Sequence, residues 1–280
     1  MRVQMLGLCR FSYLGMRGFQ VDHASLAERR AFLYDPDRLK RRWYWFRHVA
    51  LPSWQAQIDT DFTLVVMTGP DLPQPYLSRL HRLARDHDWL RLELVPPMDR
   101  HLEACLTALR PHLDDTADVI GHFRHDDDDA VGVDYIAAAR ADFQAVRALW
   151  QRDRALCVDH ARGVMADLRG GALTLTPRIT HNATAAMTIF LPPDLPRSAV
   201  HYEHWKVGLW MPNVAITRDP MFLRLIHDDA DSGDMGAGYG WPADAADWPG
   251  LLRRRFNVDL DRLERGARRF GRGGAGGGDC

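Results

Sequence analysis

Short apolar segments alternate with amphipathic segments through the first 150 residues, and this alternation limits the fold more than any other feature. The apolar segments have the length of strands and cover residues 3–11, 62–67, 90–95 and 118–124. Residues 77–84 and 102–109 between them are expected to form helices. Strands separated by helices predict a mixed, mainly parallel α/β sheet with helices on its faces. Ligands of such sheets bind where loops meet at the carboxyl ends of the strands.

A longer helix is predicted to begin at Asp35-Pro36, because Asp is a good helix cap and Pro fits the first turn. Its apolar residues recur every three or four positions and so share one face; they are Leu39, Trp43, Phe46, Ala50 and Trp54. Pro52 is expected to kink or end this helix.

The pattern is looser after residue 150. Strands are predicted at residues 155–159, 172–176 and 185–191, and a helical segment at 244–268. The glycine-rich residues 269–280 bury little apolar surface and are expected to be disordered. The sequence therefore predicts one domain over residues 1–268, divided near residue 150, with no internal repeat.

Charge and cysteine content exclude several classes of function. Lys and Arg number 36 and Asp and Glu 37, so the net charge of −1 gives no reason to expect a nucleic-acid partner. The four cysteines lie too far apart for a zinc knuckle, and a reduced compartment suits them best. No signal peptide or membrane-spanning segment is recognised. We therefore expect a cytoplasmic protein whose contact with a membrane, if any, is peripheral.

Four consecutive aspartates, Asp126 to Asp129, follow the apolar strand at 118–124 and precede an amphipathic helix. Adjacent carboxylates repel one another, and a divalent cation such as Mg²⁺ or Mn²⁺ removes that repulsion. Because side chains alternate along an extended chain, Asp126 and Asp128 are expected to point together into a cleft. Asp127 is expected to face solvent. The alternative interpretation is a solvated turn without a ligand.

The order strand, Asp-x-Asp-Asp, helix resembles the nucleotide-sugar-binding half of GT-A glycosyltransferases. Further segments extend the resemblance over residues 3 to 235 and are similar to the bacterial rhamnosyltransferase family. These segments are Leu8-Cys9-Arg10-Phe11-Ser12, Glu28-Arg29-Arg30, Leu51-Pro52-Ser53-Trp54-Gln55-Ala56-Gln57, Asp61-Phe62-Thr63-Leu64, Met221-Phe222 and His227-Asp228-Asp229-Ala230-Asp231-Ser232. The resemblance implies a GT-A-like fold and a metal-dependent transferase that uses a nucleotide-sugar donor such as dTDP-rhamnose.

The resemblance also implies roles for individual residues. Asp126 would lie near the ribose and the metal, Asp128 would bind the metal directly, and Asp129 would orient the loop or contact the donor sugar. Arg10, at the end of the first strand, would meet the nucleotide or its phosphates, and the alternative is an ordinary surface or salt-bridge arginine. His227 would complete the metal shell, and the alternative for its segment is a helix-capping or loop role.

The catalytic base is less defined by the sequence. Proton removal from an acceptor hydroxyl needs a nearby carboxylate, and Glu203 and Asp229 are the main candidates beside Asp219 and Asp228. The acceptor is a glycan or a lipid-linked molecule, and the sequence does not choose between them or fix the oligomeric state.

Two other functions remain open on the sequence. The same aspartates would serve a nucleotidyltransferase or phosphoesterase with two metal ions, although no compact phosphate-binding loop is visible. A carbohydrate-binding protein with a calcium loop would instead use tryptophans as stacking platforms. The better candidates for sugar contact are the tryptophans of the loop-rich second half, namely Trp205, Trp210, Trp241 and Trp248.

Overall fold

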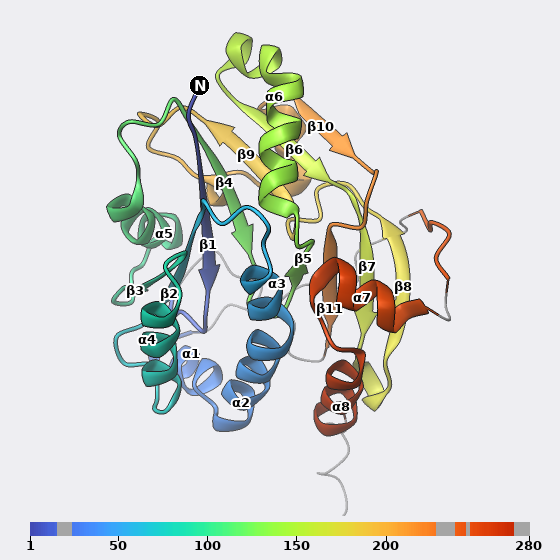
Figure 1. Ribbon diagram of the computed structural model, residues 1–280. Coiled ribbons are helices and arrows are strands. Elements are labelled where there is room, and N and C mark those ends of the chain that lie inside the picture. Colours follow the sequence, from blue (N-terminus) through green and yellow to red (C-terminus); the bar gives the residue numbers. More distant parts are fainter. Residues whose placement is uncertain (16–23, 228–238, 245–246, 272–280) are drawn as a thin grey trace, which may run out of the picture.

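Two β-sheets organise the protein in the computed structural model, which describes residues 1–15, 24–227, 239–244 and 247–271 (Figure 1). The larger sheet has seven strands in the order β10-β6-β9-β4-β1-β2-β3. Its strands are β1 (Val3–Arg10), β2 (Thr63–Thr68), β3 (Leu90–Leu94), β4 (Val119–His125), β6 (Leu156–His160), β9 (Met187–Leu191) and β10 (Asn213–Ile216). Only β9 runs antiparallel to its neighbours β4 and β6. The predicted mixed and mainly parallel α/β class is confirmed.

A second sheet of four strands lies beside the first, in the order β5-β11-β7-β8. Its strands are β5 (Ala130–Val131), β7 (Arg162–Asp167), β8 (Thr174–Ile179) and β11 (Phe222–Ile226). Helices α7 (Trp248–Phe256) and α8 (Leu260–Phe270) share a buried apolar cluster with this sheet. The first strand of this sheet along the chain, β5, begins at Ala130, directly after the aspartate run.

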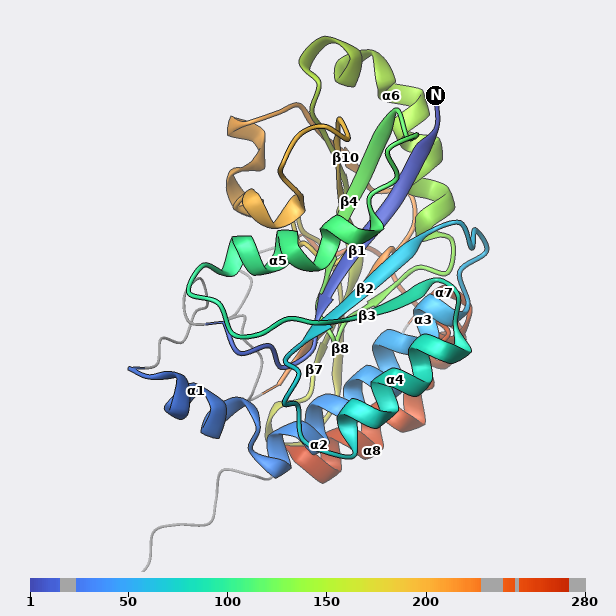
Figure 2. The ribbon, with the colours of Figure 1, turned by 90° about the vertical axis from the view of Figure 1, so that its left-hand side faces the viewer.

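Alternating side chains of β1 give the large sheet two buried faces. Val3, Met5 and Cys9 pack into one apolar cluster, and Leu6 and Leu8 into another, as the two-residue period of a strand requires. The first cluster lies under α2 (Pro36–Trp45), α3 (Leu51–Gln55), α4 (Tyr76–Asp86) and α6 (Tyr135–Asp153). The second lies under α5 (His101–Leu109), and Figure 2 shows α5 on the side of β1 and β2 opposite to α2, α3 and α4.

The helix predicted from Asp35 forms as expected, with the Asp35 side chain accepting the backbone N–H of Arg38. It does not end or break at Pro52. A π-helical turn, η1 (Phe46–Ala50), follows α2, and Pro52 lies in the first turn of α3, which reaches Gln55. Proline is tolerated there because the first turn of a helix leaves its N–H groups unbonded anyway.

The second half departs further from the prediction. Three strands, β7, β10 and β11, lie in segments where no strand was predicted, and the helical segment 244–268 is two helices. Asn257 takes a left-handed conformation, with φ of 53°, and ends α7 before α8 begins. Residues 272–280 of the glycine-rich tail lie outside the described residues. No helix in the described part of the chain has the length and apolar character needed to cross a bilayer.

Candidate active site

The aspartate run lies at the carboxyl edge of the large sheet, between β4 and β5. Strands β1 and β4 are parallel neighbours, and their register pairs Cys9 with His125. The next residue of each strand therefore reaches the same edge, which brings Arg10 toward Asp126. The prediction that the run follows a buried strand at this edge is confirmed.

Asp127 is completely buried and does not face solvent, so that expectation was wrong. The guanidinium of Arg42, on α2, donates to both of its carboxylate oxygens, with Nε 3.2 Å from Oδ2 and Nη2 in direct contact with Oδ1. A two-point pair of this kind fixes the carboxylate in orientation as well as in charge. Asp127 thereby anchors the run to α2.

Asp128 binds two different partners through one oxygen. Its Oδ2 accepts hydrogen bonds from Arg42 Nη1 at 2.9 Å and from His227 Nε2 at 2.8 Å. Burial alone would raise the pKa of Asp128, but Arg42 and His227 outweigh it and hold the pKa well below its usual range. The His227 ring also stacks on Trp45 of α2, with ring centroids 6.1 Å apart.

Asp126 is the most exposed member of the run and lies between two arginines. Its Oδ1 is 3.7 Å from Arg10 Nη2 and 3.9 Å from Arg124 Nε. Burial alone would raise the pKa of Asp126, and the two guanidinium groups, Arg124 first, lower it instead. Arg10 is itself held by His101, whose Nε2 is 2.9 Å from Arg10 Nη1.

His101 is the hydrogen-bond acceptor in this contact. Burial, followed by the nearby Arg10 and Arg124, lowers the pKa of His101 to about 3, so the ring is neutral.

Asp129 differs from Asp126 and Asp128, because its pKa is raised where theirs are lowered. Burial raises the pKa of Asp129 well above its usual range, and the Arg224 guanidinium opposes that rise. Its Oδ1 accepts the backbone N–H of Leu225 at 3.1 Å. Arg224 is buried and donates to the carbonyl oxygen of Ala183 at 2.9 Å. Asp129 therefore connects the run to β11 of the second sheet.

Arginines of the chain itself provide the positive charge near the four acids. The sequence analysis missed two of these arginines, Arg42 and Arg224, and it also missed the neutral His101 that bonds to Arg10. Arg42 carried a signal, since it lies three residues after Leu39 and four before Phe46, on the stripe predicted to be buried. A charged residue on such a stripe needs a buried partner of opposite charge.

The donor atoms around Asp128 fit a hard divalent cation in part. Among the described residues, no group of three or more His, Cys, Asp or Glu side chains is arranged to hold a metal ion. Asp128 and His227 are nevertheless in contact, and a carboxylate oxygen and an imidazole nitrogen are both ligands of Mn²⁺. A metal ion between them would replace their present hydrogen bond. Mg²⁺ commonly takes only one or two carboxylates and completes its shell with water and substrate phosphates. These two residues would therefore supply only part of the ligand shell of a divalent cation.

A cleft of about 790 Å³ opens beside Asp126. Arg10 and Arg124, which flank Asp126, form part of its wall, and so do Glu203 and the exposed Trp205. Glu203 precedes a 3₁₀ segment, η5 (His204–Leu209), and its carboxylate pairs with Lys206 at 2.5 Å. Glu203 thus lies on the same cleft as Arg10. Asp229, the other predicted base, lies outside the described residues.

His201 and His204 also line this cleft but belong to different 3₁₀ segments. His201 Nδ1 accepts from the backbone N–H of Ser198 at 3.1 Å, and His204 Nδ1 donates to the carbonyl oxygen of Asn182 at 2.6 Å. Both contacts are to backbone groups, which is consistent with a structural role for the two rings.

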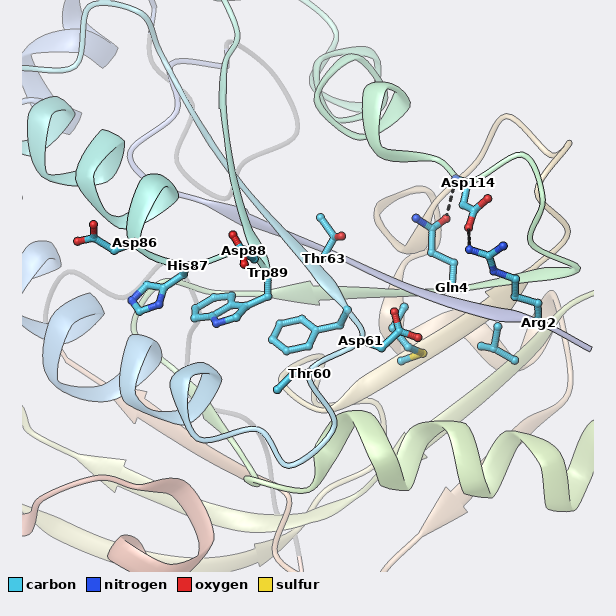
Figure 3. Close-up of a pocket in the computed structure, with 13 residues that line it drawn as sticks. Arg2, Gln4, Thr60, Asp61, Thr63, Asp86, His87, Asp88, Trp89 and Asp114 are labelled. Carbon is cyan, nitrogen blue, oxygen red and sulfur yellow. Dashed lines mark hydrogen bonds and ion pairs between the residues drawn. The ribbon is translucent and has the colours of Figure 1, made fainter.

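A second cleft, of about 600 Å³, lies at the opposite edge of the sheet, near Arg2 and Trp89 (Figure 3). Its polar groups are partly bonded to each other, since Asp114 pairs with Arg2 and its backbone N–H donates to Gln4. Trp89 stacks between His87 and Phe62, with centroid separations of 5.1 and 5.4 Å. Neither face of Trp89 is therefore free to stack on a sugar.

Several solved structures share features of the fold. A putative nucleotide-diphospho-sugar transferase from Desulfovibrio desulfuricans G20 is 11% identical, with a TM-score of 0.42 over 95% of this chain and 96% of that one. S. aureus TarS 1-349 in complex with UDP is 12% identical, with a TM-score of 0.40 over 81% of this chain. The match covers 61% of the TarS chain.

A putative glucose-1-phosphate thymidylyltransferase from Bacillus anthracis is 13% identical, with a TM-score of 0.37 over 98% of each chain. All three TM-scores are below 0.5, so the assignment of this chain does not rest on them. The comparison with curated proteins found no match. The model of the family described as "Putative rhamnosyl transferase" matches residues 4–239, which is most of the sequence, and the chain therefore belongs to this family of glycosyltransferases.

Proposed function

We propose that this glycosyltransferase moves a rhamnosyl group from a nucleoside diphosphate donor to a hydroxyl acceptor in the cleft beside Asp126. The observation that carries the proposal is the position of Arg10 and Arg124, which flank Asp126 and also form the wall of the cleft. A diphosphate that enters the cleft would meet both guanidinium groups. The family description supports the choice of a rhamnosyl group, and dTDP-rhamnose as the donor remains a prediction from the sequence.

Charge stabilisation is the main requirement of the reaction, because the leaving diphosphate gains negative charge as the glycosidic bond breaks. Arg10 and Arg124 would bind this charge by charge-assisted hydrogen bonds. A divalent cation held by Asp128 and His227 would add Lewis-acid stabilisation when bound. His101 holds Arg10 in its position on the cleft wall, because its neutral ring accepts a hydrogen bond from Arg10 Nη1.

Glu203 is the proposed base. Its carboxylate lies on the cleft wall and is about half exposed, so an acceptor hydroxyl can approach it. In a direct displacement the acceptor oxygen forms the new bond to the anomeric carbon while the bond to the diphosphate oxygen breaks. The hydroxyl proton passes to Glu203, and the nucleoside diphosphate leaves. Asp229 remains a prediction from the sequence.

A donor screen that measures nucleoside diphosphate release tests the proposal, with dTDP-, UDP- and GDP-sugars each supplied with Mn²⁺ or Mg²⁺. We expect release from at least one donor, and loss of release of at least 100-fold in Asp128→Asn and in Glu203→Gln. Asp153→Asn, which removes a surface pair with Arg152, is the matched control and should retain activity. Pyrophosphate in place of nucleoside diphosphate would identify a nucleotidyltransferase and refute sugar transfer.

A further inference from the structure

The cleft beside Asp126 combines a charged end with an apolar wall. The charged end contains Arg10 and Arg124 at the edge of the sheet. The apolar wall comes from two segments that contact each other, α5 and the turn η4 (Ala199–His201) with the residues after it. Its apolar side chains are Leu102, Leu106, Val200, Tyr202 and Trp205. Leu102 and Leu106 are four residues apart and share one face of α5.

A smaller cavity of about 190 Å³ continues this wall beyond Leu106, which lines both spaces. Its apolar lining consists of Leu106, Leu109, Leu113, Pro193, Leu195 and Pro196. The charged side chains that border it, Arg110, Asp194 and Arg197, are exposed and form its rim. The buried ring of His122 also lines it, and burial lowers the pKa of His122 to about 3, so that ring adds no charge.

The direction of this apolar path follows from two contacts of α5. Its first residue, His101, bonds to Arg10 at the carboxyl end of β1. The carbonyl oxygen of His112, just after α5, accepts from Gln4 at the amino end of the same strand, at 2.6 Å. The path therefore runs along β1, from the charged end beside Asp126 toward Leu113.

Apolar surface also continues outward from the cleft. Trp205, Leu209 and Trp210 are 65%, 79% and 63% exposed, and all three lie in or directly after η5. A purely polar glycan would leave this surface and the wall of α5 in contact with water. An apolar group placed there would be stabilised in proportion to the apolar surface that it removes from water.

We propose that the acceptor is amphiphilic, with its reacting hydroxyl between Arg10 and Glu203 and an alkyl chain lying along α5 past Leu106. This inference rests on the proposed sugar transfer and specifies the substrate class of that same cleft. The polarity of the cleft supports it, because Arg10 and Arg124 lie together at one end and the apolar wall of α5 and η4 lines another part. The other charged side chains of the lining besides Glu203, namely Asp99, Arg100 and Glu103, are exposed. The charged side chains at the rim of the smaller cavity are exposed, so the far end of the apolar path lies next to solvent.

Binding of methyl, hexyl and octyl glucoside, each below its critical micelle concentration, tests the proposal by calorimetry with Mn²⁺ and dTDP present. We expect octyl glucoside to bind at least 30-fold more tightly than methyl glucoside. Leu106→Trp, which enlarges the one side chain that lines both cavities, should remove this chain-length advantage. Leu102→Asn at an exposed position should reduce it about fivefold. Ile58→Asp, an exposed residue that lines neither cavity, is the control and should keep the full advantage.

Equal binding of the three glucosides would overturn the proposal, and so would an unchanged chain-length advantage in Leu106→Trp. Weaker dTDP binding in Leu106→Trp, with no effect of chain length, would assign the apolar wall to the nucleobase. The two levels of inference are separable. If binding depends on chain length but no donor releases nucleoside diphosphate, sugar transfer is refuted and the alkyl site is not. If a donor does release nucleoside diphosphate but the three glucosides bind equally, the alkyl site is refuted and sugar transfer is not.

Discussion

Arg42 and Asp127 form a buried ion pair in which one guanidinium contacts both carboxylate oxygens and also reaches Asp128 through Nη1. Both partners are less than one-tenth exposed. The pair joins α2 to the loop after β4, so the position of the aspartate run depends on a helix 85 residues earlier in the chain. The Arg42 guanidinium therefore neutralises part of the charge of the aspartate run without any ligand.

Removing one partner of this pair should destabilise the fold. Asp127→Asn keeps the volume of the side chain but leaves the buried Arg42 without its two-point partner, and breaking a buried pair in this way costs about 3 kcal/mol or more. Urea denaturation followed by circular dichroism measures the loss. Asp61→Asn, which removes an exposed pair with Arg140, should cost less than about 1 kcal/mol. Equal small losses in both variants would show that the buried pair does not stabilise the protein.

The contact between His101 and Arg10 should affect donor binding more than stability. His101→Phe keeps a ring of similar shape but removes the acceptor for Arg10 Nη1, and a hydrogen bond to a charged group contributes about 1.5 kcal/mol or more. We expect the KM for the donor to rise about tenfold with kcat little changed. The double variant His101→Phe/Arg10→Lys should have the same KM for the donor as Arg10→Lys alone, because both substitutions remove the same contact. Fully additive effects would contradict this coupling.

Asp159, on β6, should make stability depend on pH. It is buried, and burial raises its pKa to about 6, against the hydrogen bond from the backbone N–H of Asn182. The folded state thus binds the proton more tightly than the unfolded state, whose Asp pKa is about 3.9. The stabilising contribution is complete below pH 4 and is lost as the pH rises through 6, by about 3 kcal/mol in all.

Asp159→Asn tests this dependence, because the amide carries no charge and keeps an oxygen for Asn182. The variant should be more stable than the wild-type protein at pH 7.5 and differ little from it at pH 4, in denaturation midpoints measured at both values. If the denaturation midpoints of the wild-type protein and the variant differ by the same amount at both pH values, the raised pKa of Asp159 is ruled out.

Gly7 in the middle of β1 should tolerate no side chain. A Cβ at this position would lie 2.0 Å from Cε2 of the buried Phe123 on β4. Gly7→Ala is therefore expected to cost roughly 1–3 kcal/mol through overpacking. Phe123→Leu frees part of that space, so the double variant should lose less stability than the two single losses combined. Thermal unfolding of the four proteins measures the coupling, and strict additivity would count against this contact.

The sequence predicted the fold well where patterns are local. The strands of the first half, the cap at Asp35 and the helix at 77–84 each depend on residues a few positions apart. The second half was predicted less well. Strand β7 follows β6 after a single residue, Ala161, and no turn signature separates the two strands. The break between α7 and α8 depends on the backbone conformation of Asn257, which apolar periodicity does not reveal.

The site shows the same division. The position of the aspartate run after a buried strand was predictable, and so was the approach of Arg10 to that edge of the sheet. The arginine partners of the acids were not, because Arg42 and Arg224 are 85 and 95 residues away from Asp127 and Asp129. His227, which is 99 residues from Asp128, was placed near it only through the family resemblance.

The sequence by itself determined that strands and helices alternate, that acids gather at the end of a strand, and to which family the chain belongs. Only the tertiary structure decided which acid is buried, which pairs with arginine and which lies beside the arginines of the cleft wall. The physical reason is that hydropathy and capping act between near neighbours in the chain. The charge state of a carboxylate is set by burial and by whichever cations the fold brings within a few ångströms of it.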